Sequence, residues 1–151
     1  MTKEFYLKCL AVVMALIQPI IILSFCGTEV ISISSMWGGD LQPLFICTNA
    51  ITSYFFFQTN RWMIPSLFLL LLTAFSVNLY PEIHNILAGL FFMSSLVPMI
   101  DRRYNVFGIL YLFTIPIGLY YSFFWMEFWA IYVLCAYHLR NMYIMWKYEH
   151  R

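Results

Sequence analysis

The sequence predicts an all-α membrane protein, a bundle of six transmembrane helices with both termini in the cytoplasm. Two observations lead to this fold class. Hydrophobic residues make up 63% of the 151-residue chain and charged residues 10%, against about 45–50% and about 25% in soluble domains. When the apolar segments are threaded through a bilayer, all 8 Lys and Arg residues fall on one side, as the positive-inside rule predicts for cytoplasmic loops. We expect one transmembrane domain over residues 1–151.

The helices are predicted from apolar segments long enough to cross the hydrocarbon region, which takes about 20 residues, with a usual range of about 17–25. The first segment is too long for the core of a signal peptide and lacks a clear small-residue cleavage site, so we expect it to stay as an anchor. The expected spans are residues 5–26, 41–58, 62–79, 83–100, 105–121 and 125–146.

The division between the last two spans needs its own argument, because the apolar character barely breaks over residues 106–145. A single helix of that length would measure about 60 Å, twice the thickness of the hydrocarbon. We therefore expect a turn at residues 121–125, after Pro116 and Gly118 have loosened the helix. Five spans would also place the C-terminal cations outside: Arg140, Lys147 and Arg151.

The connections are very short except for the first outer loop, residues 27–40. Short connections make successive helices pack as antiparallel neighbours. The loop alternates apolar and small polar residues over 30–34 and then breaks at Gly38-Gly39. Two interpretations stay open: an extended flap over the outer face, or an ordinary amphipathic surface loop.

Polar residues within the spans are expected to turn toward the bundle interior or the interface, because hydrocarbon offers them no partner. In the sixth span, Glu127, His138 and Asn141 project within about 40° of one line on the helix. Glu127 and His138 lie about 16 Å apart along the axis, so a proton or ion path would need polar groups from other spans. Those candidates are Gln18, Asn49 and Ser53. The alternative is that Glu127 lies among the lipid headgroups, that His138 bonds a backbone carbonyl in a packed bundle, and that the other polar groups serve helix packing.

The two expected membrane faces differ in charge. On the outer side, an acidic rim would concentrate cations by its field, or its members are simply loop residues: Glu29, Asp40, Glu82 and Glu127, with His84 beside them. On the inner side, arginines would contact lipid phosphates or only determine the topology: Arg102, Arg103 and Arg140.

Several functional classes are disfavoured by what the sequence lacks. A net charge of +1 gives no basic stripe for a nucleic acid. The sequence contains no HExxH, no GxSxG, no phosphate loop and no acidic pair at metal-ligand spacing. His84, His138 and His150 lie at different depths, whereas a haem bundle needs paired histidines. We expect no catalytic residue, no metal and no cofactor.

Two stretches carry a family resemblance. Ile-Ser elements, glycines and a proline lead into the second span: Ile31-Ser32, Ile33-Ser34, Gly38-Gly39, Pro43 and Phe45. The fourth span opens with His84, Ala88 and Phe91-Phe92. Together these stretches resemble the six-helix membrane family of damage-regulated autophagy modulators and their GPI-lipid-remodelling relatives. The chain is shorter than typical members and lacks their denser proline and acidic pattern. The resemblance implies a non-enzymatic or lipid-handling role and places no catalytic residue here.

The favoured function is a non-enzymatic membrane module that assembles with itself or with a partner protein. A sensor, effector or accessory subunit of an immunity or phage-defence system, in a bacterial inner membrane, would have such tiny loops and small or polar helix faces. Two other functions stay open. One is a channel or transporter for ions or protons along the Glu127–His138–Asn141 line. The other is the binding or handling of lipid beneath the 27–40 loop. Membrane lipids are expected partners throughout.

Overall fold

The computed structural model describes residues 3–25, 32–38, 40–59, 61–100 and 106–149. Within these ranges every element is a helix and no strand occurs. The predicted all-α class is therefore confirmed. The elements are α1 (Lys3–Phe25), η1 (Ile33–Gly38), α2 (Gln42–Phe57), α3 (Met63–Ala74), α4 (Pro81–Met99), α5 (Val106–Leu112), α6 (Thr114–Tyr120) and α7 (Phe123–Glu149).

In the described ranges the α-helices form six rods at the positions of the six predicted segments, because α5 and α6 continue one another. Between them, the amide of Phe113 donates to the carbonyl of Leu110 at 3.3 Å, which is a tighter turn than the α-helix makes. The expected turn before the last rod is present, since α6 ends at Tyr120 and α7 begins at Phe123.

The third rod is shorter than predicted, because α3 ends at Ala74 rather than near residue 79. Phe75 is extended (φ −113°, ψ 110°), and the amide of Asn78 donates to the hydroxyl of Ser76 at 3.1 Å. Ser side chains compete in this way with helical hydrogen bonds. Pro81 then occupies the first turn of α4, where its fixed φ suits a helix start. The hydropathy of the sequence did not indicate this turn.

Among the described residues, two helices, α1 and α4, have the length and apolarity that a membrane crossing needs, whereas α3 and the α5–α6 rod are shorter apolar helices. The coarse prediction of an all-helical chain is thus confirmed, and α1 and α4 are candidates for membrane spans by length and composition. With 16 residues, α2 measures about 24 Å, less than the hydrocarbon thickness of about 30 Å.

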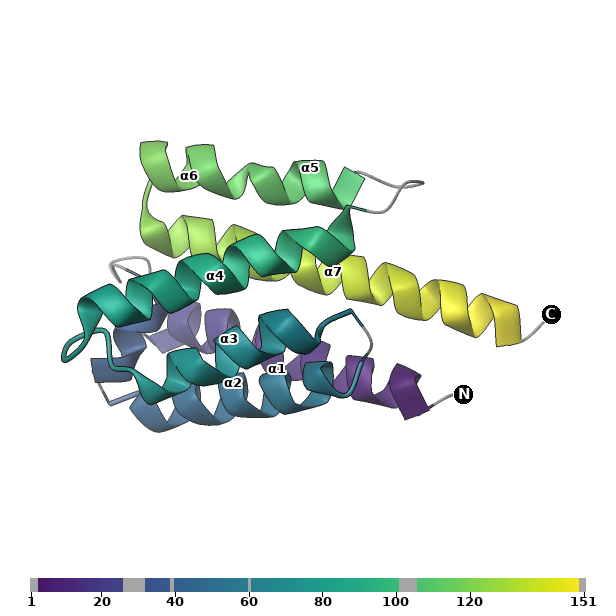
Figure 1. Cartoon of the computed structure of the whole chain (residues 1–151), viewed down its shortest axis with the longest axis horizontal. Coiled ribbons are helices and arrows are strands. Elements are labelled where there is room, and N and C mark those ends of the chain that lie inside the picture. Colours follow the sequence, from purple (N-terminus) through teal and green to yellow (C-terminus); the bar gives the residue numbers. More distant parts are fainter. Residues whose placement is uncertain (1–2, 26–31, 39, 60, 101–105, 150–151) are drawn as a thin grey trace.

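The rods lie roughly along one direction, and both termini are at the same end of the molecule (Figure 1). The first four α-helices pack in sequence, α1 on α2, α2 on α3 and α3 on α4. The longest helix, α7, packs against α1 and also against α5 and α6. The α5–α6 rod therefore attaches to the bundle mainly through α7.

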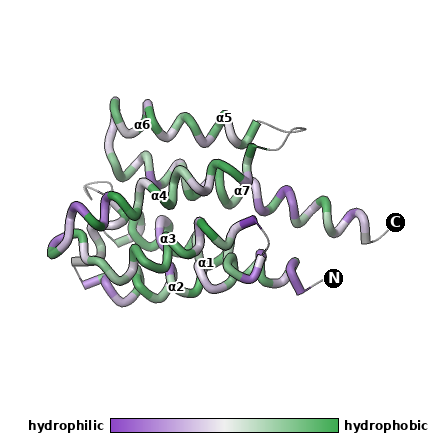
Figure 2. Tube along the Cα trace, in the orientation of Figure 1, coloured by the Kyte–Doolittle hydropathy of each residue, from purple (hydrophilic) through white to green (hydrophobic). Residues whose placement is uncertain are grey.

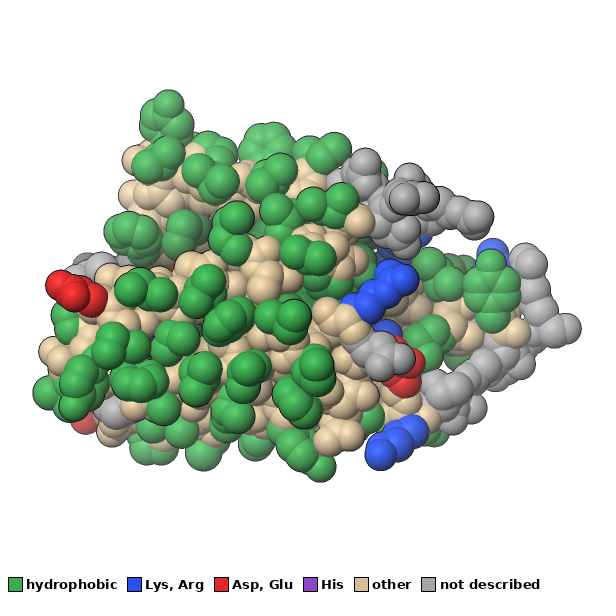
Figure 3. Space-filling view, in the orientation of Figure 1, with side chains coloured by type: hydrophobic (Ala, Val, Ile, Leu, Met, Phe, Trp, Pro, Cys, Tyr) green, Lys and Arg blue, Asp and Glu red, His purple; other side chains and the backbone are tan. Residues whose placement is uncertain are grey.

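Apolar and polar side chains are distributed unlike those of a soluble domain. Large hydrophobic side chains are exposed along every rod, and Val97 and Leu119 are more than two-thirds exposed, at 72% and 78%. Figure 2 shows hydrophobic residues on all the rods, and Figure 3 shows hydrophobic side chains over most of the visible face. In that view Lys and Arg lie in the half that carries the termini. Several polar side chains are almost fully buried: Gln18, Ser53, Ser66, His84, Ser95 and His138.

Candidate functional site

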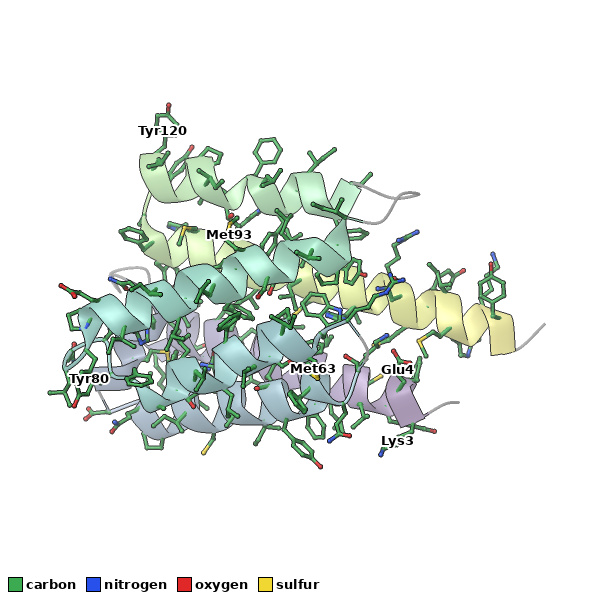
Figure 4. All side chains as sticks on the ribbon, viewed as in Figure 1. Lys3, Glu4, Met63, Tyr80, Met93 and Tyr120 are labelled. Carbon is green, nitrogen blue, oxygen red and sulfur yellow. The ribbon has the colours of Figure 1, made fainter. Side chains whose placement is uncertain are left out.

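A lateral groove of about 600 Å³ lies between α4 on one side and the α5–α6 rod with the start of α7 on the other. Its volume falls within the range of about 300–1,000 Å³ that is typical of small-molecule sites. Met93 lies in the space between α4 and the rod (Figure 4). Most lining residues are apolar, and among them are Phe92, Met93, Leu96, Leu112, Ile115 and Met126.

Glycines explain why the rod is held at its two ends and stands apart from α4 between them. A Cβ on Gly108 would lie 3.3 Å from Cγ1 of Ile100, so the rod approaches the end of α4 closely. A Cβ on Gly118 would lie 2.7 Å from Sδ of Met126, so α6 also approaches α7 closely. Gly89 of α4 lines the groove, and a Cβ there would meet no atom within 4 Å. The groove is the open space between these two contacts.

The polar end of the groove is organised by Glu127, near the start of α7. Its Oε2 accepts hydrogen bonds from the amides of Ile33 (2.5 Å) and Ser34 (3.4 Å), and its Oε1 accepts one from the hydroxyl of Ser34 (3.1 Å). The first amides of η1 have no partner within a helix, so the carboxylate satisfies them. Ile33 and Met36 are buried in the apolar core beside it. This part of the 27–40 loop is therefore packed onto the bundle.

A second space, the central cavity of about 70 Å³, lies among α1, α2, α3, α4 and α7. It is lined by Gln18, Asn49 and Glu127, which brings together three residues proposed for the polar path. The side-chain amide of Gln18 donates to the carbonyl of Phe45 (3.1 Å) and to the hydroxyl of Thr48. Among the described residues, the buried hydroxyl of Thr52 has no hydrogen-bond partner, and it also lines this cavity.

The other path residues lie elsewhere. The hydroxyl of Ser53 donates to the carbonyl of Ser66 at 2.5 Å and thus joins α2 to α3. His138 is fully buried, with its ring centre 4.3 Å from that of Phe56 and 4.4 Å from that of Trp62. Within the described part of the chain, neither His138 nor Asn141 lines the central cavity or the groove. The structure thus gathers the Glu127 end of the proposed line around the central cavity and leaves His138 in packed surroundings.

The predicted outer cluster is divided between surface and interior. Asp40 and Glu82 are exposed, whereas His84 is only 1% exposed. Nδ1 of His84 donates to the carbonyl of Phe75 at 2.7 Å, so the ring ties the start of α4 to the preceding turn. Glu29 lies outside the described residues. His84 is accordingly a packing residue here and does not line the groove.

The predicted inner arginines are described in part. Arg140 is half-buried, and its guanidinium carbon lies 5.9 Å from the ring centre of Phe107, which is within cation–π range. This contact joins α7 to α5. Arg102 and Arg103 lie outside the described residues.

Sequence reasoning missed the residues that shape the groove. Gly89 carried a usable signal, because a glycine inside an apolar helix lowers helix stability and suggests a packing or functional reason. Ser34 and Thr52 carried no such signal, since their places depend on how η1 and α2 pack. No family model, curated protein or solved structure matches the chain. The resemblance to the autophagy-modulator family therefore stays a prediction.

Proposed function

We propose that this chain is a six-span, non-enzymatic membrane protein that holds the acyl chain of a lipid-like amphiphile in the lateral groove. The observation that carries the proposal is the lateral groove itself, which is mostly apolar, has a volume of about 600 Å³ and has a polar end at Glu127. Sites for small molecules are typically apolar with a few convergent polar groups.

A membrane location is supported by the molecular surface. The six rods coincide with the six apolar segments, and large hydrophobic side chains face outward on each. Cations lie in the half with the termini (Figure 3), which favours cytoplasmic termini in a bacterial inner membrane. In this orientation the Glu127 end of the groove faces outward.

The dimensions of the groove match one membrane leaflet. From Asn85 to Leu96 its α4 wall covers twelve residues, and the eleven steps between them rise about 16 Å at about 1.5 Å per step. That is about half of the roughly 30 Å hydrocarbon thickness. An acyl chain of the outer leaflet would lie along the apolar wall. Its headgroup would then lie beside Ser32, Ser34 and Glu127.

Ion passage and assembly, the other functions considered for this chain, differ in the support that they have. Passage of ions along α7 is less favoured, because His138 does not line the central cavity and lies against the rings of Phe56 and Trp62, which do. Assembly with another copy or with a partner protein stays a prediction. It is compatible with lipid binding, since the groove is built from one chain.

Substitutions at Gly89 test the proposal. Gly89→Leu should fill the groove without a backbone clash, because a Cβ there meets open space. In lipid nanodiscs, we expect this variant to bind a fluorescent acyl probe at least about tenfold more weakly, a difference of about 1.4 kcal/mol. Gly89→Ala is the matched control and should bind as the original chain does. Equal probe affinity in a Gly89→Leu variant that melts at the original temperature would overturn the proposal.

A further inference from the structure

The proposed function leaves the headgroup of the amphiphile unassigned, and the junction of the two spaces points to its chemistry. We infer that the headgroup is a protonated amine that binds the carboxylate of Glu127, while a single acyl chain lies in the lateral groove. This inference rests on the proposed function and names the ligand class for the same site.

The lateral groove and the central cavity meet at shared walls. Ser34, Ala88, Phe92 and Glu127 line both spaces. A headgroup at the outer end of the groove would therefore lie beside Glu127 and next to the central cavity. That cavity, at about 70 Å³, has room for about two water-sized groups, since one water occupies about 30 Å³ of the liquid.

The charge at this junction favours a cation. Among the described residues that line the two spaces, Glu127 is the one charged side chain, and no Lys, Arg or His accompanies it. The two η1 amides and the Ser34 hydroxyl stabilise its charge only through dipoles. A phosphate or carboxylate headgroup would add a second negative charge in apolar surroundings. An ammonium group would supply the missing opposite charge.

Hydrogen-bonding capacity favours the same headgroup. A carboxylate offers about four lone-pair sites, and the contacts from Ile33 and Ser34 leave Oε1 of Glu127 with one bond. The buried hydroxyl of Thr52, unpaired among the described residues, lines the adjoining cavity together with Asn49. An ammonium group has donors only, so it complements these oxygen acceptors. A neutral alcohol would use them less fully.

The test compares three amphiphiles of equal chain length: tetradecylamine, tetradecanol and tetradecanoate. Each amphiphile competes with the fluorescent acyl probe for binding to the full chain in nanodiscs of zwitterionic phospholipid at neutral pH, and the displacement of the probe gives its affinity. We expect the amine to bind at least about tenfold more tightly than the alcohol and the carboxylate to bind most weakly. Tighter binding of the carboxylate than of the amine would overturn the inference.

Two variants separate the charge of Glu127 from carboxylates elsewhere on the chain. Glu127→Gln should abolish the preference for the amine and keep binding of the alcohol. Glu82→Gln removes an exposed carboxylate that lines neither space, so the amine preference should survive. An unchanged preference in Glu127→Gln would refute the inference while leaving groove binding intact. If Gly89→Leu alters the binding of none of the three amphiphiles, the groove itself is not the site and both proposals fail.

Discussion

Glu127 and Gln18 show how single polar side chains organise this apolar bundle. Glu127 connects the start of α7 to the first turn of η1. Gln18 connects α1 to the first half of α2, and it is only 2% exposed. In each case the side chain satisfies groups that hydrocarbon would leave without a partner. Each contact joins segments that are far apart in the sequence.

At Glu127, we expect Glu127→Gln to lower the free energy of opening of η1 by about 1 kcal/mol. Hydrogen bonds to a charged acceptor are stronger than those to a neutral one by about that amount. Hydrogen exchange measured by mass spectrometry should then be faster at the amides of Ile33 and Ser34. The exposed carboxylate of Glu82 gives a matched control, since Glu82→Gln should leave exchange in η1 unchanged. Equal exchange in both variants would contradict the structural role of Glu127.

At Gln18, we expect Gln18→Leu to lower the free energy of unfolding by between about 0.6 and about 1.7 kcal/mol, the average and the maximum for hydrogen bonds between membrane helices. The substitution removes both contacts from α1 to α2 and keeps similar bulk. Denaturant titration in detergent would measure the loss. Gln58→Leu, at an exposed position after α2, is the control and should change little.

The sequence could predict that polar side chains in the spans turn inward, and Gln18, Asn49 and Ser53 do so. It could not predict which of them meet, because their contacts depend on how each helix is rotated against its neighbours. His84 shows the difficulty. Its position near a helix start suggested the outer surface, but the turn after α3 brings the carbonyl of Phe75 to its ring.

At the scale of elements, the predictable part of the fold is the set of six rods, because hydropathy reports where an apolar helix lies. The boundaries of α3 and the break at Phe113 depend on local hydrogen bonds, which hydropathy does not report. The lateral groove was equally hidden. It arises because the α5–α6 rod contacts α7 closely at Gly118 and stays apart from α4 at Gly89.

These two glycines should respond oppositely to alanine. We expect Gly89→Ala to stabilise the protein by up to about 1 kcal/mol, the difference in helix propensity, since the added Cβ meets open space. Gly118→Ala should destabilise it, because the Cβ would lie 2.7 Å from Sδ of Met126 and α6 would have to shift from α7. Thermal unfolding in detergent would compare the two. A loss of stability in Gly89→Ala would show that α4 is in fact packed there.

At the scale of the whole molecule, the Lys and Arg side chains visible in Figure 3 lie in the half that carries the termini, and several polar side chains are buried while large hydrophobic ones face outward. Exposed carboxylates, Asp40 and Glu82, lie near the starts of α2 and α4. Lys3 and Glu4 lie at the end with the termini (Figure 4). The groove opens sideways between rods, so an amphiphile could enter from the bilayer without crossing it. The orientation of the chain in the membrane therefore decides from which leaflet an amphiphile would reach the Glu127 end of the groove.

That orientation can be measured by labelling single cysteines in intact cells with a membrane-impermeant maleimide. In a variant whose 4 native cysteines are replaced by alanine, Glu82→Cys should be labelled from outside, since Glu82 is exposed at the start of α4. Lys147→Cys, exposed in the last turn of α7, should react only after the cells are opened. Both sites are exposed positions in terminal helical turns, so the two cysteines should have similar intrinsic reactivity toward the maleimide. Labelling of Lys147→Cys in intact cells would place the termini outside, and the Glu127 end of the groove would then face the cytoplasm.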